Sequence, residues 1–401
     1  MNTESNVALP EWTGKNENLR LPVSREEMAQ RRDAVLEAMQ REGVDVAVFT
    51  TPETIFYLTG IGLNRYCYQP LIISASGKHR YTCRHIDLGW QDVWGPQTWV
   101  KDWVSFRDHE DVLALVSDLI REIQPDPKKK PTLGFELERS SISYNGVNRI
   151  AQLAEAGNIV SCTRFAEDLR VIKSPAEIEL MRRSGRMSSQ LADVVVQAVR
   201  AGATDAEASI AAGQLLNQLS GSPRPAPTVH TGAAAGNGHM TAWTNMAPRP
   251  GETVTFHVSG FVSNYACPIE RTILRGPDKN NILPMLDAVE RVTQKLVASL
   301  RPGMTSSAAN EIALAEHRAR GYDQHWRNHA GYSTGINWVE FDLFRIRPDD
   351  ERTLKPGMTL HLVQCLTVPG LTNAQASRVV VITDDGAELL NDYPLRIEPF
   401  N

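Results

Sequence analysis

The sequence predicts two domains, an α/β domain followed by an α+β domain, and three observations lead to this prediction. The chain has 401 residues, which is more than one compact hydrophobic core usually serves. Short apolar segments alternate with amphipathic helical stretches up to about residue 170. Beyond that point, long helices are interspersed with strands whose polarity alternates. We therefore expect one domain over 1–170 and a second over 171–401.

The first domain is expected to open with an amphipathic helix over 24–43. Met28, Val35 and Met39 recur at helical spacing behind a capping box formed by Ser24 and Glu27. The further elements expected here are strands at 44–50, 70–74 and 131–137 and a helix at 113–123.

The second domain is expected to begin with a long helix that has a clear start signal. Ser174 is a good N-cap, Pro175 occupies the first helical position, and Glu177 lies three residues beyond the cap. Further helices are expected over 205–219, 285–300 and 306–320, and strands over 253–261, 268–274, 358–368 and 377–390. Helices covering an antiparallel sheet are therefore the predicted architecture.

Composition limits the partners and the compartment. The formal net charge of −5 offers no general attraction to nucleic acid or to anionic lipid. No apolar run approaches the roughly 18–20 residues that span a bilayer, and no signal-peptide core is present, so a cytoplasmic protein is expected. The cysteines are scattered without a CxxC pair and predict free thiols: Cys67, Cys83, Cys162, Cys267 and Cys365.

Four segments resemble the creatinase, aminopeptidase P and prolidase family, whose catalytic domain has the pita-bread fold. They are LRVIKSPAEIELMR (169–182), PGETVTFHVSGFVSNYACPIERTIL (250–274), LKPGMTLHLVQCL (354–366) and SRVVVITDDGAELL (377–390). The second is similar to the family pattern GDxVxxDxGxxxxGYxxDxTRT and the third to LxPGMVxxxEP. The resemblance implies a creatinase-type N-terminal α/β domain followed by a pita-bread α+β domain.

The family's metal-dependent members hold a pair of divalent ions with two Asp, one His and two Glu. The resemblance places other residues at these positions: His257, Pro268, Tyr332, Val363 and Arg378. None is a carboxylate, Pro268 and Val363 carry no ligand atom, and the Arg378 guanidinium is a permanent cation. We expect neither a metal pair nor any other cofactor in this chain.

Three residues are candidates for the chemistry. His257 lies on the polar face of TVTFHVSG, where the alternative is a hydrogen-bonded core histidine. Glu270 precedes Arg271, as a Glu precedes the RT dipeptide in creatinase, and the alternative is a buried ion pair. The resemblance to creatinase makes His239 the general acid or base, against a loop histidine without a role.

Other residues are candidates for holding the substrate. Tyr332 and His329 offer hydrogen bonds, and Arg378 is expected to clamp a substrate carboxylate or to form a structural ion pair. Trp243 and Tyr265 are expected to form an aromatic wall, with core packing as the alternative.

The loop NRYCYQP (64–70) matches a segment that reaches the partner's site in creatinase-like dimers. The resemblance therefore implies a homodimer in which Arg65 and Tyr68 complete the second subunit's site. Ordinary loop packing is the alternative.

These features predict a metal-independent enzyme. Segments 239–252 and 265–273 look most like ectoine hydrolase, which opens a cyclic amidine. The expected reaction is hydrolysis of a non-peptide C–N bond in a small amidine, guanidine or amide that bears a carboxylate. A lyase that acts on a small zwitterionic metabolite, and a non-catalytic pseudo-peptidase that binds small molecules or peptides, are the alternatives.

Overall fold

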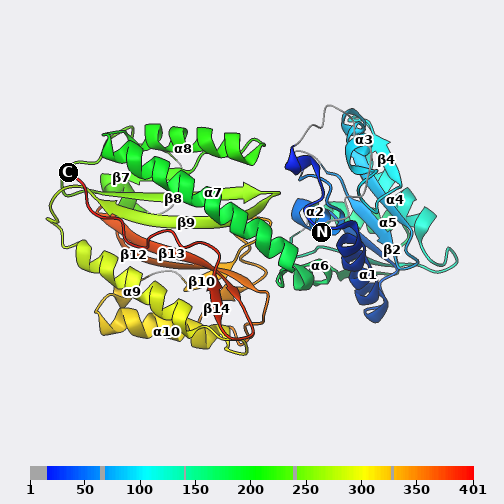
Figure 1. Ribbon diagram of the computed structural model, residues 1–401. Coiled ribbons are helices and arrows are strands. Elements are labelled where there is room, and N and C mark those ends of the chain that lie inside the picture. The colour runs from blue at the N-terminus through cyan, green and yellow to red at the C-terminus, as the bar shows by residue number, and fades with distance from the viewer. Residues whose placement is uncertain (1–15, 64–67, 140, 238–241, 327–328) are drawn as a thin grey trace. The chain divides into compact units, whose positions relative to one another are not determined.

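The computed structural model divides the chain into two compact units, Met1–Arg170 and Val171–Asn401 (Figure 1). It describes residues 16–63, 68–139, 141–237, 242–326 and 329–401. Each unit has its own sheet and its own hydrophobic core, as the predicted fold class requires.

The N-terminal unit is an α/β sandwich built on a six-stranded sheet of order β4-β3-β2-β1-β5-β6. β1 pairs in parallel with β5 and antiparallel with β2, so the sheet is mixed. The strands are β1 (Val46–Phe49), β2 (Leu71–Ser74), β3 (His79–Arg84), β4 (Trp103–Phe106), β5 (Thr132–Phe135) and β6 (Asn158–Ser161). The α-helices are α1 (Arg25–Arg41), α2 (Pro52–Thr59), α3 (Trp90–Trp94), α4 (Val112–Ile123), α5 (Tyr144–Leu153) and α6 (Thr163–Arg170).

The C-terminal unit has an eight-stranded sheet of order β11-β10-β12-β13-β9-β8-β7, with β14 paired to β13. Among the described residues, these strands pair with one another in antiparallel fashion, as predicted. The strands are β7 (Thr228–Thr231), β8 (Thr253–Val262), β9 (Tyr265–Leu274), β10 (Gly331–Ser333), β11 (Arg345–Ile346), β12 (Thr359–Val368), β13 (Thr372–Ile382) and β14 (Ala387–Leu389). The α-helices are α7 (Pro175–Arg200), α8 (Asp205–Ser220), α9 (Leu283–Ser299) and α10 (Ser306–Ala319).

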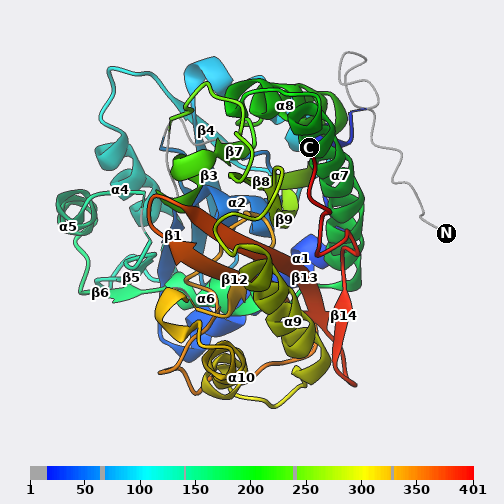
Figure 2. The same ribbon diagram turned by 90° about the vertical axis from the view of Figure 1, so that its left-hand side faces the viewer.

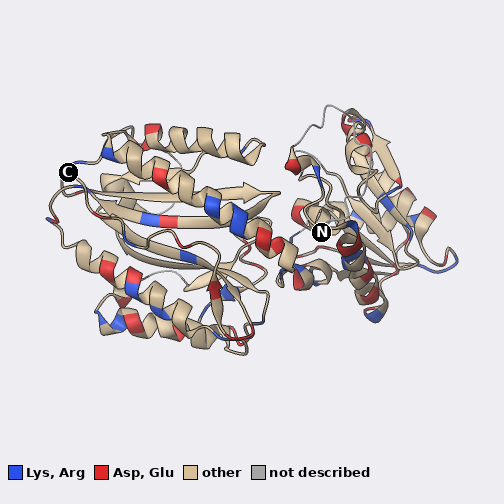
Figure 3. Cartoon of the chain, in the orientation of Figure 1, with Lys and Arg blue, Asp and Glu red and all other residues tan. Residues whose placement is uncertain are grey.

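Helices cover one face of this sheet (Figures 1 and 2). Helix α7 packs on β8 and β9, and α9 packs on β12 and β13. The start of α7 is as predicted, because Ser174 and Glu177 form a reciprocal capping box and Pro175 follows the cap. Few charged side chains lie on the long strands, whereas both signs are spread over the helices (Figure 3).

Close approach of α7 to the sheet depends on one glycine. A Cβ at Gly260 would lie 2.4 Å from the Ser184 carbonyl oxygen, so only glycine fits there. Ser188 Oγ then accepts from the Gly260 amide at 2.7 Å and donates to the Cys267 carbonyl at 2.5 Å. The helix is thereby hydrogen-bonded to the backbone of the β8–β9 hairpin.

Over the ranges that the structure describes, no helix is both long enough and apolar enough to cross a bilayer.

Candidate active site

A row of side chains crosses the sheet of the C-terminal unit on the face opposite α7 and α9. Val363 of β12 pairs with Ser377 of β13, and His257 of β8 pairs with Glu270 of β9. The Glu270 amide donates to Ser377 Oγ at 2.9 Å, which joins the two pairs into one row. Because side chains alternate between the faces of a strand, all four residues point to the same side.

The centre of the row is a carboxylate beside an imidazole. Glu270 Oε2 lies 3.8 Å from His257 Nε2, and the two residues are 7% and 9% exposed. His257 Nε2 is also 2.7 Å from Gln375 Oε1, a carbonyl oxygen that only accepts. The ring nitrogen therefore carries the hydrogen of that bond, and His257 presents a fixed orientation to Glu270.

Aromatic and imidazole rings continue the site toward β10 and β12. Tyr332 Oη lies 2.8 Å from His361 Nδ1, and the rings of Tyr332 and Phe341 meet edge to face at 4.6 Å. The Trp338 ring lies 6.4 Å from the rings of both His257 and His361. Burial and the nearby Glu270 carboxylate hold the pKa of Tyr332 well above its usual value, so this phenol stays protonated.

His329 lies at the edge of this ring cluster. Its ring is 5.6 Å from that of Tyr332 and 5.3 Å from that of Phe341. Burial, with a smaller contribution from Arg345, lowers the pKa of His329 to about 4. The imidazole is therefore neutral near pH 7 and can hydrogen-bond without adding charge.

A buried ion pair supports the segment that carries these rings. Lys173 Nζ is 3.1 Å from Glu340 Oε2 and 3.3 Å from Ser333 Oγ, and both charged side chains are 2% exposed. Lys173 precedes α7, while Ser333 and Glu340 flank the turn after β10. The turn that presents Trp338 is thereby fixed to the base of the long helix.

The expected role of Arg378 as a carboxylate clamp needs correction. Its guanidinium donates to the backbone carbonyls of Asn391 and Tyr393, on the face opposite Ser377. The sequence-based placement is off by one residue, and a shift of one position moves a side chain to the other face of a strand. Ser377 is the residue of this strand that faces the site.

Tyr265 is also on the wrong face for the predicted aromatic wall. It is fully buried, and its hydroxyl donates to Glu177 of α7 at 2.7 Å. Tyr265 therefore belongs to the packing between α7 and β9, which was the alternative interpretation. Trp243 is 43% exposed and precedes Thr244, whose amide donates to Asp205; its contact with substrate stays a prediction.

Two predicted residues, His239 and Arg65, lie outside the described residues. Tyr68 packs against the hydrophobic core of the N-terminal unit, and burial raises the pKa of its hydroxyl. This contact fits the alternative of ordinary loop packing. A contribution of Arg65 and Tyr68 to a second subunit's site stays a prediction.

The residues on the site face do not fit a pair of divalent ions. At the family's ligand positions stand His257, Pro268, Tyr332, Val363 and Ser377, now with Ser377 in place of Arg378. Pro268 and Val363 offer no ligand atom, the Tyr332 phenol is protonated, and His257 Nε2 is engaged by Gln375. Within the described part of the chain, no group of three or more His, Cys, Asp or Glu is placed to hold an ion.

Sequence reasoning missed four members of the site: Ser377, Gln375, His361 and Trp338. His361 could have been identified from the alternation in LHLVQCL. It lies between Leu360 and Leu362, so it shares a face of the strand with Val363. Gln375 and Ser377 follow from the same alternation once the face of β13 is known.

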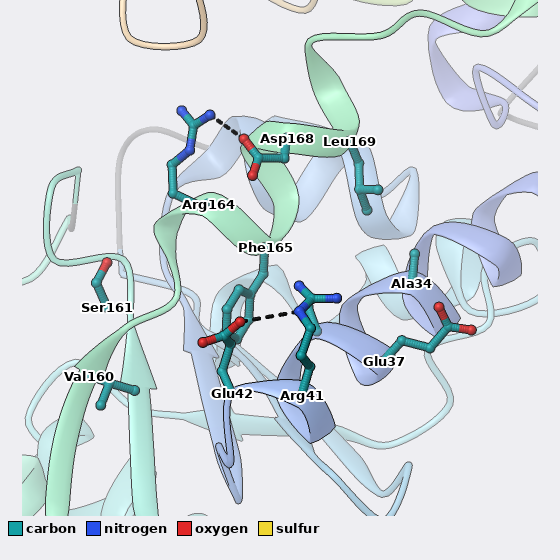
Figure 4. A pocket seen from close by; sticks show the side chains of 11 residues that line it. Ala34, Glu37, Arg41, Glu42, Val160, Ser161, Arg164, Phe165, Asp168 and Leu169 are labelled. Atoms are coloured by element: carbon teal, nitrogen blue, oxygen red, sulfur yellow. Dashed lines mark hydrogen bonds and ion pairs between the residues drawn. The ribbon is translucent and has the colours of Figure 1, made fainter. Parts of the chain in front are cut away.

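The N-terminal unit contains a separate cavity of about 500 Å³ between α1, β6 and α6 (Figure 4). Four of its charged side chains form two ion pairs, Arg41 with Glu42 at 3.2 Å and Arg164 with Asp168, and Glu37 also lines it. Its lining contains neither His nor Cys. Because most of its charges are already neutralised locally, this cavity is a poorer candidate for catalysis than the site on β8, β9, β10, β12 and β13.

The fold and the site positions define a pita-bread protein, and comparison with known families agrees. Residues 179–384 match the model of metallopeptidase family M24, and residues 31–172 match that of the creatinase/prolidase N-terminal domain. The chain therefore belongs to the M24 family and carries a creatinase-type N-terminal domain.

Among curated relatives, ectoine hydrolase of Halomonas elongata is 25% identical over 94% of this chain and 98% of its own length. The Xaa-Pro dipeptidase of Lactobacillus helveticus is 24% identical over 92% and 98% of the two chains. These relatives are hydrolases, which supports the predicted enzyme class.

Solved structures agree on the fold. The prolidase of Thermococcus sibiricus superposes with a TM-score of 0.82 at 16% identity, covering 92% of this chain and 98% of its own. The prolidase of Pyrococcus horikoshii OT3 gives 0.79 at 17% identity, covering 92% and 100%.

Proposed function

We propose that the chain is a metal-independent hydrolase that cleaves a non-peptide C–N bond in a small amidine, guanidine or amide bearing a carboxylate. The observation that carries this proposal is the Glu270–His257 pair, which occupies the middle of the row where metal-dependent relatives place ion ligands. The likeness to ectoine hydrolase over nearly the whole chain supports the same class of substrate.

In this proposal the Glu270 carboxylate binds the cationic nitrogen group of the substrate, and the His257 imidazole, oriented by Gln375, helps to bind the same polar group. Water adds through its oxygen to the carbon of the C–N unit and gives one proton to His239, the proposed base. The C–N bond then breaks, and the nitrogen leaves as an amine after it takes that proton from His239. One water molecule is consumed for each bond cleaved.

The test is a thermal-shift screen with ectoine, creatine and 4-guanidinobutanoate, followed by product analysis in ¹⁸O-labelled water. A ligand at 100 times its Kd should stabilise the protein by about 2.7 kcal/mol. A hydrolase places ¹⁸O in the acid or carbonyl product, whereas a lyase leaves a double bond and no label. Tight binding without turnover would instead indicate a binding protein.

Metal independence is tested by measuring activity in the presence of a chelator and the metal content of the purified protein. We expect activity to survive EDTA and elemental analysis to find far less than one transition metal per chain. Activity that EDTA abolishes and Zn²⁺ or Mn²⁺ restores would contradict the proposal.

The homodimer and the cytoplasmic location remain predictions. Light scattering of the purified chain measures the dimer directly, and a mass corresponding to one chain of 44.5 kDa would contradict it.

A further inference from the structure

His361 has a polar atom that the site leaves without a partner. The side chain is fully buried in the middle of β12, and its Nδ1 is 2.8 Å from Tyr332 Oη. Its Nε2 has no hydrogen-bond partner among the residues that the structure describes. Buried nitrogens of this kind are almost always satisfied in proteins, so a missing partner points to water or to a ligand.

The hydrogen bond between Tyr332 and His361 decides which nitrogen of His361 carries the hydrogen. The Tyr332 phenol stays protonated, and its hydroxyl is placed to donate to Nδ1 of His361 at 2.8 Å. A neutral imidazole that accepts at Nδ1 carries its hydrogen at Nε2.

Burial favours this neutral form. Desolvation, reinforced by His257 and Arg271, holds the pKa of His361 well below its usual value. His361 Nε2–H is thus a buried donor that still needs an acceptor.

His361 lies on the site face, on a strand that is not adjacent to the one carrying Glu270. It shares the face of Val363 on β12, and the Trp338 ring lies 6.4 Å from the rings of both His257 and His361. Two strand spacings, about 10 Å, separate β12, which carries His361, from β9, which carries Glu270. The negative charge of Glu270 repels an anionic group of a ligand. Such a group is therefore expected to bind away from Glu270, where His361 offers a hydrogen-bond donor.

We propose that His361 Nε2–H donates a hydrogen bond to the carboxylate of a bound zwitterionic substrate whose cationic end lies at Glu270. His361 then makes the site prefer ligands with a carboxylate over their uncharged amides. Arg378 was expected to have this role. This inference rests on the proposed function, because it needs a ligand that carries both a cationic nitrogen group and a carboxylate.

The test compares each acid with its uncharged amide, in wild type and in two variants. The probes are ectoine, creatine and 4-guanidinobutanoate, each beside its carboxamide, and Kd is measured by calorimetry. His361→Asn keeps a polar group near Tyr332 but lacks an atom at the Nε2 position, whereas His361→Gln places an amide N–H there. His361→Asn should weaken binding of the acid about tenfold or more and change that of the amide less than about twofold, with His361→Gln between.

The outcomes separate this inference from the proposed function. An acid preference that survives His361→Asn, or equal loss for acid and amide, overturns the role of His361 alone. Wild-type protein that binds none of the six probes overturns both proposals. If His361→Asn does not fold, the ¹⁵N spectrum of wild-type imidazoles decides, since an Nδ1–H tautomer of His361, assigned with His361→Gln, overturns the inference.

Discussion

Glu270 and His257 lie directly opposite each other on β9 and β8, with the carboxylate Oε2 3.8 Å from the imidazole Nε2. Such a pair combines a negative charge with a neighbouring hydrogen-bond donor on a rigid sheet. Catalytic groups held on strands keep their geometry better than groups on loops. The pair is therefore the part of the site whose removal has the clearest expected effect.

Glu270→Gln should abolish most of the activity without unfolding the protein. Glutamine has nearly the same shape but cannot neutralise a cationic substrate, so kcat/KM should fall about 100-fold or more, with a melting temperature close to wild type. Asp287→Asn on α9 is the matched control, because it removes an exposed carboxylate paired with Arg291. Activity of Glu270→Gln within about twofold of wild type would exclude this carboxylate from catalysis.

Adjacent substitutions on β13 should separate binding from stability. Arg378→Met removes donors to the carbonyls of Asn391 and Tyr393, which should cost about 1–3 kcal/mol of unfolding free energy and leave ligand Kd unchanged. Ser377→Thr keeps the hydroxyl that accepts from the Glu270 amide but adds a methyl group to the site face, so it should weaken ligand binding with little change in stability. Urea titrations and calorimetry on both variants make the comparison, and loss of acid binding by Arg378→Met would restore the carboxylate-clamp interpretation.

The buried pair of Lys173 and Glu340 predicts a strong asymmetry between single and double substitutions. Lys173→Met leaves a carboxylate buried without its cation and should destabilise the protein by about 3–5 kcal/mol. Lys173→Met combined with Glu340→Met removes both charges and should recover most of that loss. Chemical denaturation of the two single variants and the double variant measures this. A double variant that loses as much unfolding free energy as the two single variants together would contradict the prediction.

Three buried imidazoles predict that the C-terminal unit loses stability in mild acid. Burial lowers the pKa of His317, His329 and His361 in the folded protein, that of His329 to about 4. Below about pH 6.5 the unfolded chain binds protons that the folded chain does not, so stability falls with falling pH. For His329 the loss extends from about pH 6.5 to about pH 4.

Unfolding free energies at pH 7.5, 6.5 and 5.5 measure this slope, which is at most about 1.4 kcal/mol per pH unit for each proton. His317→Asn should reduce the slope by up to one proton, since His317 is packed against Trp326 and Gln364 on the helix-covered face. An unchanged slope in this variant would mean that His317 titrates normally in the folded protein.

The fold was predictable from the sequence because its signals are local. The cap at Ser174 and the alternation around His257 act within a few residues, and both predictions are confirmed in the structure. The family motifs then predicted the pita-bread fold, which the match to metallopeptidase family M24 confirms.

The errors in the site have a geometric cause. Neighbouring residues of a strand point to opposite faces of the sheet. The family position was assigned to Arg378, which points to the helix-covered face, instead of to Ser377, which points to the site. Tyr265 was likewise placed by its aromatic character, although its parity with Cys267 and Arg271 assigns it to the helix-covered face. His361 escaped notice because a single histidine in an apolar strand has a common structural explanation.

The serines of α7 have a consequence for how the molecule opens. Ser184 Oγ donates to the Tyr265 carbonyl at 2.6 Å and accepts from the Val262 amide at 3.1 Å, and Ser188 Oγ bridges Gly260 and Cys267 in the same way. Strands β8 and β9 cannot separate from α7 without losing these bonds in one event. Helix and hairpin should therefore exchange their amide hydrogens with solvent as a single cooperative unit, among the slowest of the chain.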